Sequence, residues 1–234
     1  MRRRASLSAV SSLLVFLAVV ISAASAQEVF VTPVPNAPFS AVVNIERTVA
    51  LKNGTVVSFK SLSEIGRDSS GRIHNERRTF VPDNTKPELR HVHIYDPQSR
   101  VSTEVNIEKK SFWTRTMNHA PSTEPPSIRF AAPDGNAPPS EFTKDEDLGT
   151  QEFDGVPAHG MRQTQTVVDE NTGKDVVITD EYWYSQDLRI YLLVKHLDPR
   201  RESVITAVTQ IKQTPPDRSF FEIPEGYKPR AGGQ

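Results

Sequence analysis

The sequence LGTQEFDGVPAHGMRQTQTVVDENTGKDVVITDEYWYSQDLRIYLLVKHLD, residues 148–198, contains the pattern that decides the fold. Its first run ends at Asp154-Gly155, a dipeptide suited to the positive φ angles of a two-residue hairpin turn. The second run ends at the polar, glycine-containing segment 169–174, where the chain can reverse. The third run, 176–185, is rich in β-branched and aromatic residues, which favour strands. The stretch therefore predicts three antiparallel strands joined by two tight turns.

A fourth run after residue 187 continues this meander. Alternate side chains of a strand point to opposite faces, so the apolar positions of the run are expected to share one face. These positions are Leu188, Ile190, Leu192 and Val194. The residues expected largely on the other face are Arg189, Tyr191 and Lys195. The pattern predicts a sheet with one dry side.

The first 26 residues have the features of an export signal. Three arginines at positions 2–4 precede an apolar run over 10–24, and Ala24-Ser25-Ala26 supplies the small residues that signal peptidase accepts. A membrane anchor is the alternative, but it needs about 20 apolar residues, and this run is shorter and broken by serines. We predict cleavage after Ala26, a periplasmic or secreted location, and a mature chain that does not span the membrane.

Composition narrows the possible classes. The chain contains no cysteine, so no disulfide can staple the exported protein. Only 36% of the residues are apolar, which favours a thin core built on one curved sheet. The predicted signal carries three arginines and no acid, so the mature chain has 25 basic and 29 acidic residues. A net negative chain is a poor match for nucleic acid, which requires clustered positive charge.

The N-terminal half also shows strand patterning. Residues 27–38 form an extended, proline-rich lead-in, because proline removes backbone donors. Phe39, Ala41, Val43 and Ile45 then alternate with polar residues, and Asn53-Gly54 is a strong hairpin signal. Further strands are expected at 56–65, 73–81, 91–95 and 101–107. The polar strand 73–81 is expected to face water or to form a sheet edge.

The segment 118–139 is rich in proline and resists regular structure. It is either a linker between two small domains or a surface loop between two halves of one sheet. The loop is favoured, because each half alone has a meagre core. A short helix over 140–147, with Ser140 as its N-cap, is also expected.

The C-terminal part adds one strand and an apolar clasp. The strand is expected over 203–213, after the turn that begins at Asp198-Pro199. The clasp should dock the chain end on the sheet through Phe220, Phe221, Ile223, Pro224 and Tyr227. Residues 39–228 are thus predicted to form one β domain, and 229–234 to be frayed.

The order of motifs resembles that of a group of uncharacterised exported bacterial proteins. The motifs are Leu148-Gly149, Phe153-Asp154-Gly155-Val156, Gly160, Glu181-Tyr182-Trp183-Tyr184-Ser185, Asp198-Pro199-Arg200 and Phe221-Glu222-Ile223-Pro224-Glu225-Gly226-Tyr227. More distantly, the order is similar to that of the periplasmic lipoprotein-carrier (LolA-like) superfamily, open half-barrels whose concave face takes lipid chains. With the alternation, the resemblance implies a mainly β fold: a single strongly curved antiparallel sheet, an open or half barrel with little helix.

The best candidate for an enzymatic site is His91-Val92-His93. Strand alternation puts both imidazoles on one face, a spacing that a zinc site can use, and His74 and Glu76 are possible further ligands. No hydrolase or phosphate-binding motif accompanies them. Two exposed histidines are the favoured interpretation, with no catalytic residue, metal or cofactor assigned. A metal-dependent hydrolase built on His91 and His93 is the alternative.

Aromatic residues of the fourth and third runs are candidates for a binding surface. Trp183, Tyr191 and the neighbouring Ile190 are predicted to contact an apolar ligand, since such side chains give large contact area. Central strands also use these residues for packing, so a core role stays open. The leading hypothesis is a non-enzymatic envelope protein that binds a lipid or lipoprotein acyl chain, or an envelope protein, on the concave side of the sheet.

Overall fold

The computed structural model describes residues 31–51, 53–124 and 142–230. Its strands are β1 (Phe39–Ala50), β2 (Val56–Arg67), β3 (Ile73–Arg78), β4 (Leu89–Asp96), β5 (Val101–Asn106), β6 (Ser111–Thr116), β7 (Thr143–Phe153), β8 (Val156–Val168), β9 (Asp175–Ser185), β10 (Ile190–Leu197), β11 (Glu202–Lys212) and β12 (Lys228–Pro229). A 3₁₀ helix, η1, spans Arg218–Phe221. The predicted signal peptide, most of the proline-rich segment and residues 231–234 lie outside the described residues.

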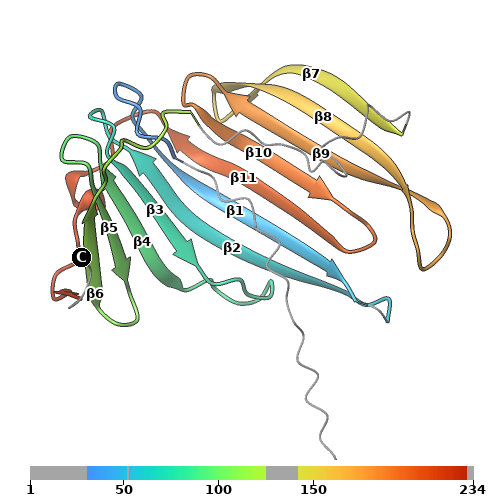
Figure 1. The fold of residues 1–234 in the computed structure, drawn as a ribbon, viewed down its shortest axis with the longest axis horizontal. Helices are drawn as coiled ribbons and strands as arrows, with labels where there is room; N and C mark the ends of the chain where they lie inside the picture. The colour runs from blue at the N-terminus through green and yellow to red at the C-terminus, as the bar shows by residue number, and fades with distance from the viewer. Residues whose placement is uncertain (1–30, 52, 125–141, 231–234) are drawn as a thin grey trace, which may run out of the picture.

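The strands form one sheet in the order β12-β6-β5-β4-β3-β2-β1-β11-β10-β9-β8-β7 (Figure 1). The N-terminal and C-terminal meanders join where β1 pairs with β11, from Ser40↔Lys212 to Val49↔Glu202. Neighbours are antiparallel except for the short pair β12 and β6. Figure 1 shows the sheet bending between β2 and β6, without closing into a barrel. The predicted fold class, a single curved and mainly antiparallel sheet with little helix, is confirmed.

The predicted hairpin turns form where glycine permits a positive φ. Asp154 and Gly155 have φ angles of 49° and 78°, as a two-residue turn between β7 and β8 requires. Gly54, at 81°, lies in the turn between β1 and β2. The hairpin turns predicted at Asn53-Gly54 and Asp154-Gly155 are therefore present in the structure.

One secondary-structure prediction is wrong, and so is one of the two alternatives for the polar strand 73–81. No helix forms over the described part of 140–147, because residues from Thr143 onward belong to β7 and pair with β8, beginning at Thr143↔Gln165. The polar strand β3 is not an edge: it lies between β2 and β4. Its charges are accommodated by an ion pair, in which the Arg78 guanidinium lies 2.8 Å from the Glu76 carboxylate.

A β-bulge in β10 corrects the predicted faces of that strand. Tyr191 pairs with Tyr184 and Leu193 with Trp183, so Leu192 is an extra residue between them. Beyond the bulge the alternation is inverted. Lys195 pairs with Glu181 on the face that Ile190 shares, whereas Val194 faces the side of Tyr191.

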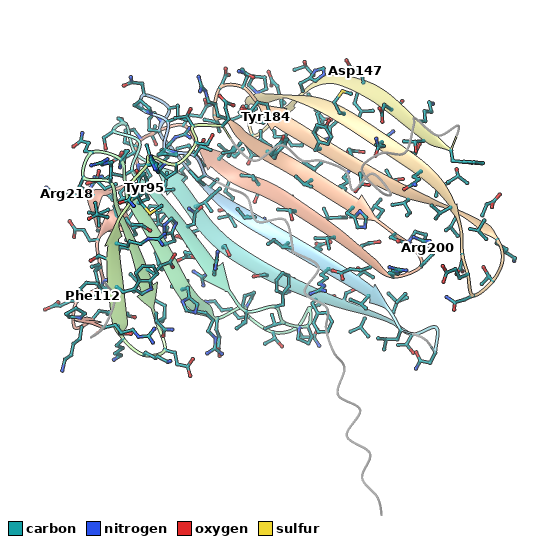
Figure 2. All side chains as sticks on the ribbon, viewed as in Figure 1. Tyr95, Phe112, Asp147, Tyr184, Arg200 and Arg218 are labelled. Carbon is teal, nitrogen blue, oxygen red and sulfur yellow. The ribbon has the colours of Figure 1, made fainter. Side chains whose placement is uncertain are left out.

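Two hydrophobic clusters stabilise the sheet. The larger one includes buried residues of β1, β2 and β8–β10, among them Phe39, Trp183 and Ile190. The smaller one consists of Val92, Ile94, Val105 and Phe221, with Phe220, Ile223 and Tyr227 packed against it. The predicted C-terminal clasp therefore docks on the sheet, and Figure 2 shows Phe112 and Arg218 at that end. Lys228 and Pro229 continue as β12. None of the described helical residues forms a segment long and apolar enough to cross a bilayer.

Candidate ligand-binding hollow

One face of strands β1–β6 lines a hollow of about 720 Å³. Residues directly opposite each other on antiparallel neighbours point to the same face, so the register identifies this surface. One row of paired residues crosses it as Ala41, Ile65, Asn75, His93, Glu104 and Trp113. All but Ala41 line the hollow. The site is thus built from alternate residues of consecutive strands.

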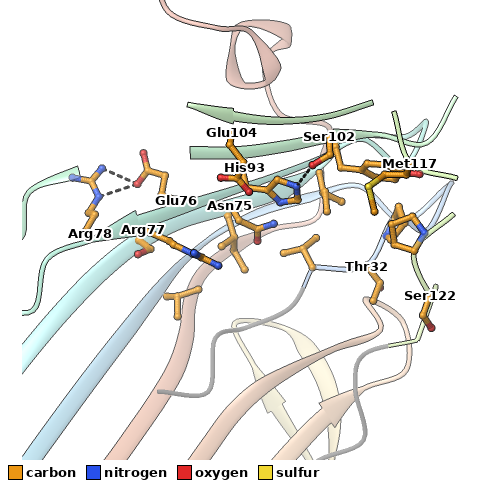
Figure 3. Close-up of a pocket in the computed structure, with 18 of the residues that line it drawn as sticks. Thr32, Asn75, Glu76, Arg77, Arg78, His93, Ser102, Glu104, Met117 and Ser122 are labelled. Atoms are coloured by element: carbon orange, nitrogen blue, oxygen red, sulfur yellow. Dashed lines mark hydrogen bonds and ion pairs between the residues drawn. The ribbon is translucent and has the colours of Figure 1, made fainter. Parts of the chain in front are cut away.

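The hollow has an apolar floor and polar ends. Val43, Ile45, Ile65 and Ile73 lie on the floor, and all four are buried. Figure 3 shows Glu76, Arg77 and Arg78 at one end of the hollow and Thr32, Met117 and Ser122 at the other. An apolar centre between polar ends suits an amphiphilic molecule better than a uniformly charged one.

Arg67 fixes the lead-in segment that contributes Val31, Thr32 and Pro33 to the hollow. Its guanidinium is fully buried and donates hydrogen bonds of 2.8–2.9 Å to the carbonyl oxygens of Ala37, Thr32 and Leu188. The carbon of the guanidinium lies 5.1 Å from the centre of the Phe39 ring. Burial, and secondarily repulsion by Arg189, lowers the Arg67 pKa to about 10. The group remains a cation at neutral pH and ties the lead-in to the β9–β10 turn.

The segment that follows β6 also lines the hollow, and it contacts the C-terminal half of the sheet. Met117, Ser122 and Glu124 line the hollow. The Glu124 carboxylate accepts hydrogen bonds from the Arg189 guanidinium at 2.9 Å and from the Tyr184 hydroxyl at 3.3 Å. Burial, followed by the nearby Glu124 charge, raises the Tyr184 pKa to about 12, so this hydroxyl stays protonated and can donate.

Two polar atoms in the wall of the hollow have no hydrogen-bond partner among the described residues. They are the Tyr95 hydroxyl and the Asn75 Oδ1 atom. Tyr95 is 1% exposed, and burial raises the pKa of its hydroxyl. Buried polar atoms are nearly always paired in folded proteins, so these two atoms are exceptions.

The histidines do not form the metal site that the hydrolase alternative requires. His93 bonds to the Ser102 hydroxyl at 3.0 Å and lines the hollow, whereas His91 is exposed. The register pairs His74 with Ile94 and Glu76 with Val92, on the face opposite His93. Among the described residues there is no group of three or more possible ligands. His91 and His93 share a face as predicted, but the sheet separates His74 and Glu76 from them.

The predicted ligand-contacting residues do not line the hollow, although Trp183 and Ile190 belong to the hydrophobic cluster that includes its floor. Trp183 and Ile190 are buried in the larger core cluster, on the face of β9 and β10 opposite Tyr191. Tyr191 packs against Tyr182 and Tyr184, with ring centres 5.8 and 5.2 Å apart. None of the three predicted residues lines the hollow. Their role as ligand contacts stays a prediction.

Sequence patterning did mark part of the hollow. Val43 and Ile45 belong to an alternation that is visible in the sequence. Trp113 and Met117 carried no such signal and were missed, although both line the hollow. Some lining residues can therefore be recognised from the alternation of apolar and polar residues. Others, such as Trp113, can be placed on this face only when the pairing of the strands is known.

On the face of β9 that carries Trp183, the buried carboxylate of Glu181 accepts hydrogen bonds from three side chains. Trp183 Nε1 and Lys195 Nζ donate to Glu181 Oε1 at 2.9 Å, and Arg162 donates to Oε2 at 2.8 and 3.1 Å. Burial raises the Glu181 pKa, but these hydrogen bonds outweigh it, and the pKa falls to about 2. Gly160 makes room for the Trp183 ring, because a Cβ there would lie 2.6 Å from Cε3.

Comparison with known proteins gives a distant likeness in fold. No family model and no curated protein sequence matches the chain. Among solved structures, MucB is 11% identical, with 82% of this chain and 58% of that chain covered and a TM-score of 0.36. The lipoprotein LppX of Mycobacterium tuberculosis is 9% identical, covering 76% and 88%, with a TM-score of 0.30.

A LolA superfamily protein from Nitrosomonas europaea is 8% identical, with 82% of this chain and 92% of that chain covered and a TM-score of 0.30. The superfamily named for this protein is the one that the motifs of this chain resemble distantly. The chain spans little more than half of the MucB chain. At these identities and TM-scores the likeness does not indicate a function. The hollow is the feature of this chain that does.

Proposed function

We propose that this chain is an exported envelope protein that binds an apolar or amphiphilic ligand, such as an acyl chain of a lipid or lipoprotein, without catalysing a reaction. The observation that carries the proposal is the hollow on β1–β6, with its buried aliphatic floor and polar ends. Burying an acyl chain on such a floor is favourable by about 0.8 kcal/mol for each methylene group.

The size of the hollow supports a small ligand. Its volume of about 720 Å³ lies in the range of small-molecule sites, roughly 300–1,000 Å³. A protein partner needs a contact area of roughly 800 Å² on each side. An acyl chain, alone or attached to a lipoprotein, is therefore the favoured occupant, and an envelope protein is the second candidate.

The first test is mass spectrometry of organic extracts from the protein purified under native conditions. We expect a co-purified lipid at a stoichiometry close to one. Absence of lipid, together with no uptake of a fluorescent fatty acid, would contradict the proposal. N-terminal sequencing of the same exported material tests the predicted signal, since the mature chain should begin at Gln27.

The second test fills the hollow. Ser63 lines it from the middle of β2, so Ser63→Trp should occupy part of the volume and weaken binding of the fluorescent fatty acid by about tenfold or more. Ser58→Trp is the matched control, because Ser58 is an exposed serine on the other face of the same strand.

A further inference from the structure

The sheet opens between β2 and β3. Pairing between these strands comprises Ile65↔Asn75, Gly66↔His74 and Arg67↔Ile73, whereas β2 pairs with β1 along its whole length. The two segments meet again at the isolated bridge Lys60↔Val81. Among the described residues, positions 61–64 of β2 have no strand partner on this side.

The side chains of Glu76 and Ser61 cross the opening, where backbone ladder bonds are absent among the described residues. The Glu64 backbone N–H donates to Glu76 Oε2 at 3.0 Å, and the Ser61 hydroxyl donates to the Arg78 carbonyl oxygen at 3.3 Å. Arg78 Nε also donates to Glu76 Oε2 at 2.8 Å, which holds that carboxylate in position. A side-chain hydrogen bond contributes about 1 kcal/mol, so separating the strands here requires less energy than breaking a regular ladder.

The hollow extends to this opening. Its lining includes Ser61 and Ser63 from β2, and Glu76, Arg78 and Phe80 from β3 and the segment after it. Figure 3 places the labelled Glu76 and Arg78 at one end of the hollow, away from Thr32 and Met117. The apolar floor therefore extends from the end at Thr32 and Met117 to the opening between β2 and β3, where the side chains are polar.

We propose that the opening between β2 and β3 is the mouth of the hollow, where the polar head of a single-chain amphiphile reaches solvent while its chain lies on the floor. This inference rests on the proposed function. Hydroxyl and charged groups at the mouth can solvate a polar head, whereas the aliphatic floor cannot. Widening of the mouth, through loss of the two crossing hydrogen bonds, lets the ligand enter and leave.

The absence of cysteine from the sequence allows a clean test. Ser63→Cys and Arg77→Cys place thiols on opposite sides of the mouth, on the face of the hollow. A direct disulfide requires Cα atoms about 4.4–6.8 Å apart, and a short bis-methanethiosulfonate reagent bridges a wider gap. The variant is loaded with a fluorescent fatty acid before bridging, and release into excess unlabelled fatty acid is followed by stopped flow.

Bridging should slow release by about tenfold or more, and dithiothreitol should restore the original rate. Thr48→Cys with Ser58→Cys is the matched control, since these residues pair on β1 and β2 with hydroxyls 3.4 Å apart on an exposed surface. Release from the bridged control should equal that of the reduced control.

Ser61→Ala combined with Glu76→Ala makes the opposite change, and should speed release by about tenfold through loss of both crossing bonds. Equal release rates in the bridged, reduced and double-alanine proteins would overturn the assignment of the mouth, although binding itself persists. Failure of the unmodified protein to take up any fatty acid would instead refute the proposed function.

Discussion

Glu181→Gln tests the hydrogen bonds that Trp183, Lys195 and Arg162 donate to the buried Glu181 carboxylate on β9. The substitution keeps the size of the side chain but removes its charge, and it replaces one acceptor oxygen with an NH₂ group. That group cannot accept the hydrogen bonds that Arg162 or Lys195 now donate. One donor then faces another in a site where Glu181 is 5% exposed. We therefore expect a large loss of stability from an isosteric change.

The magnitude follows from the pKa. A carboxyl whose pKa falls from 4.5 to about 2 on folding stabilises the folded state by about 3 kcal/mol at neutral pH. This contribution is fully present above pH 4.5, because the unfolded chain is then already ionised. It is lost as the pH falls from 4.5 through 2. Glu181→Gln should accordingly lower the free energy of unfolding at pH 7 by about 2–3 kcal/mol.

Urea unfolding followed by tryptophan fluorescence measures this loss between pH 7 and pH 2. The difference between wild type and Glu181→Gln should shrink steadily below pH 4.5. Glu146→Gln is the matched control: Glu146 also contacts Arg162, at 3.3 Å, but it is exposed, so its removal should change stability by less than about 0.5 kcal/mol. A similar small effect of Glu181→Gln, or one independent of pH, would refute the reasoning.

Three further predictions concern other buried groups. Burial lowers the His74 pKa from 6.5 to about 4, so protonation of this residue opposes folding. The resulting loss of stability is absent above pH 6.5 and grows as the pH falls from 6.5 to 4. In urea unfolding, His74→Phe should therefore make the free energy of unfolding depend less on pH over that window. Gly160→Ala should lower stability by about 2 kcal/mol in thermal unfolding, because Trp183 must move away from the new methyl group. Arg67→Met should cost about 3 kcal/mol or more in urea unfolding, since two buried carbonyl groups and one partly buried carbonyl group lose their donor, and an unchanged midpoint would contradict this.

The sequence predicted most strands because their alternation survives in one half-buried sheet. It failed at β6 for a physical reason. Phe112 packs in the smaller cluster under the C-terminal clasp, whereas the next residue, Trp113, lines the hollow. Each face of β6 therefore carries one aromatic side chain among polar ones, and no period-two alternation of apolar and polar residues is visible. The helix expected at 140–147 rested on local capping signals, which pairing of β7 with β8 overrides.

The candidate site was harder to predict because it depends on register and on small residues. Val43 pairs with Ser63 and Ile45 with Ser61, so a large aliphatic side chain lies beside a small one twice in succession. Larger residues at the two serine positions would fill the space that the hollow now occupies. Ser61 also donates the hydrogen bond that crosses the mouth. Ser61 and Ser63 thus leave room for a ligand, and Ser61 also helps to hold together the strands between which we propose that it passes.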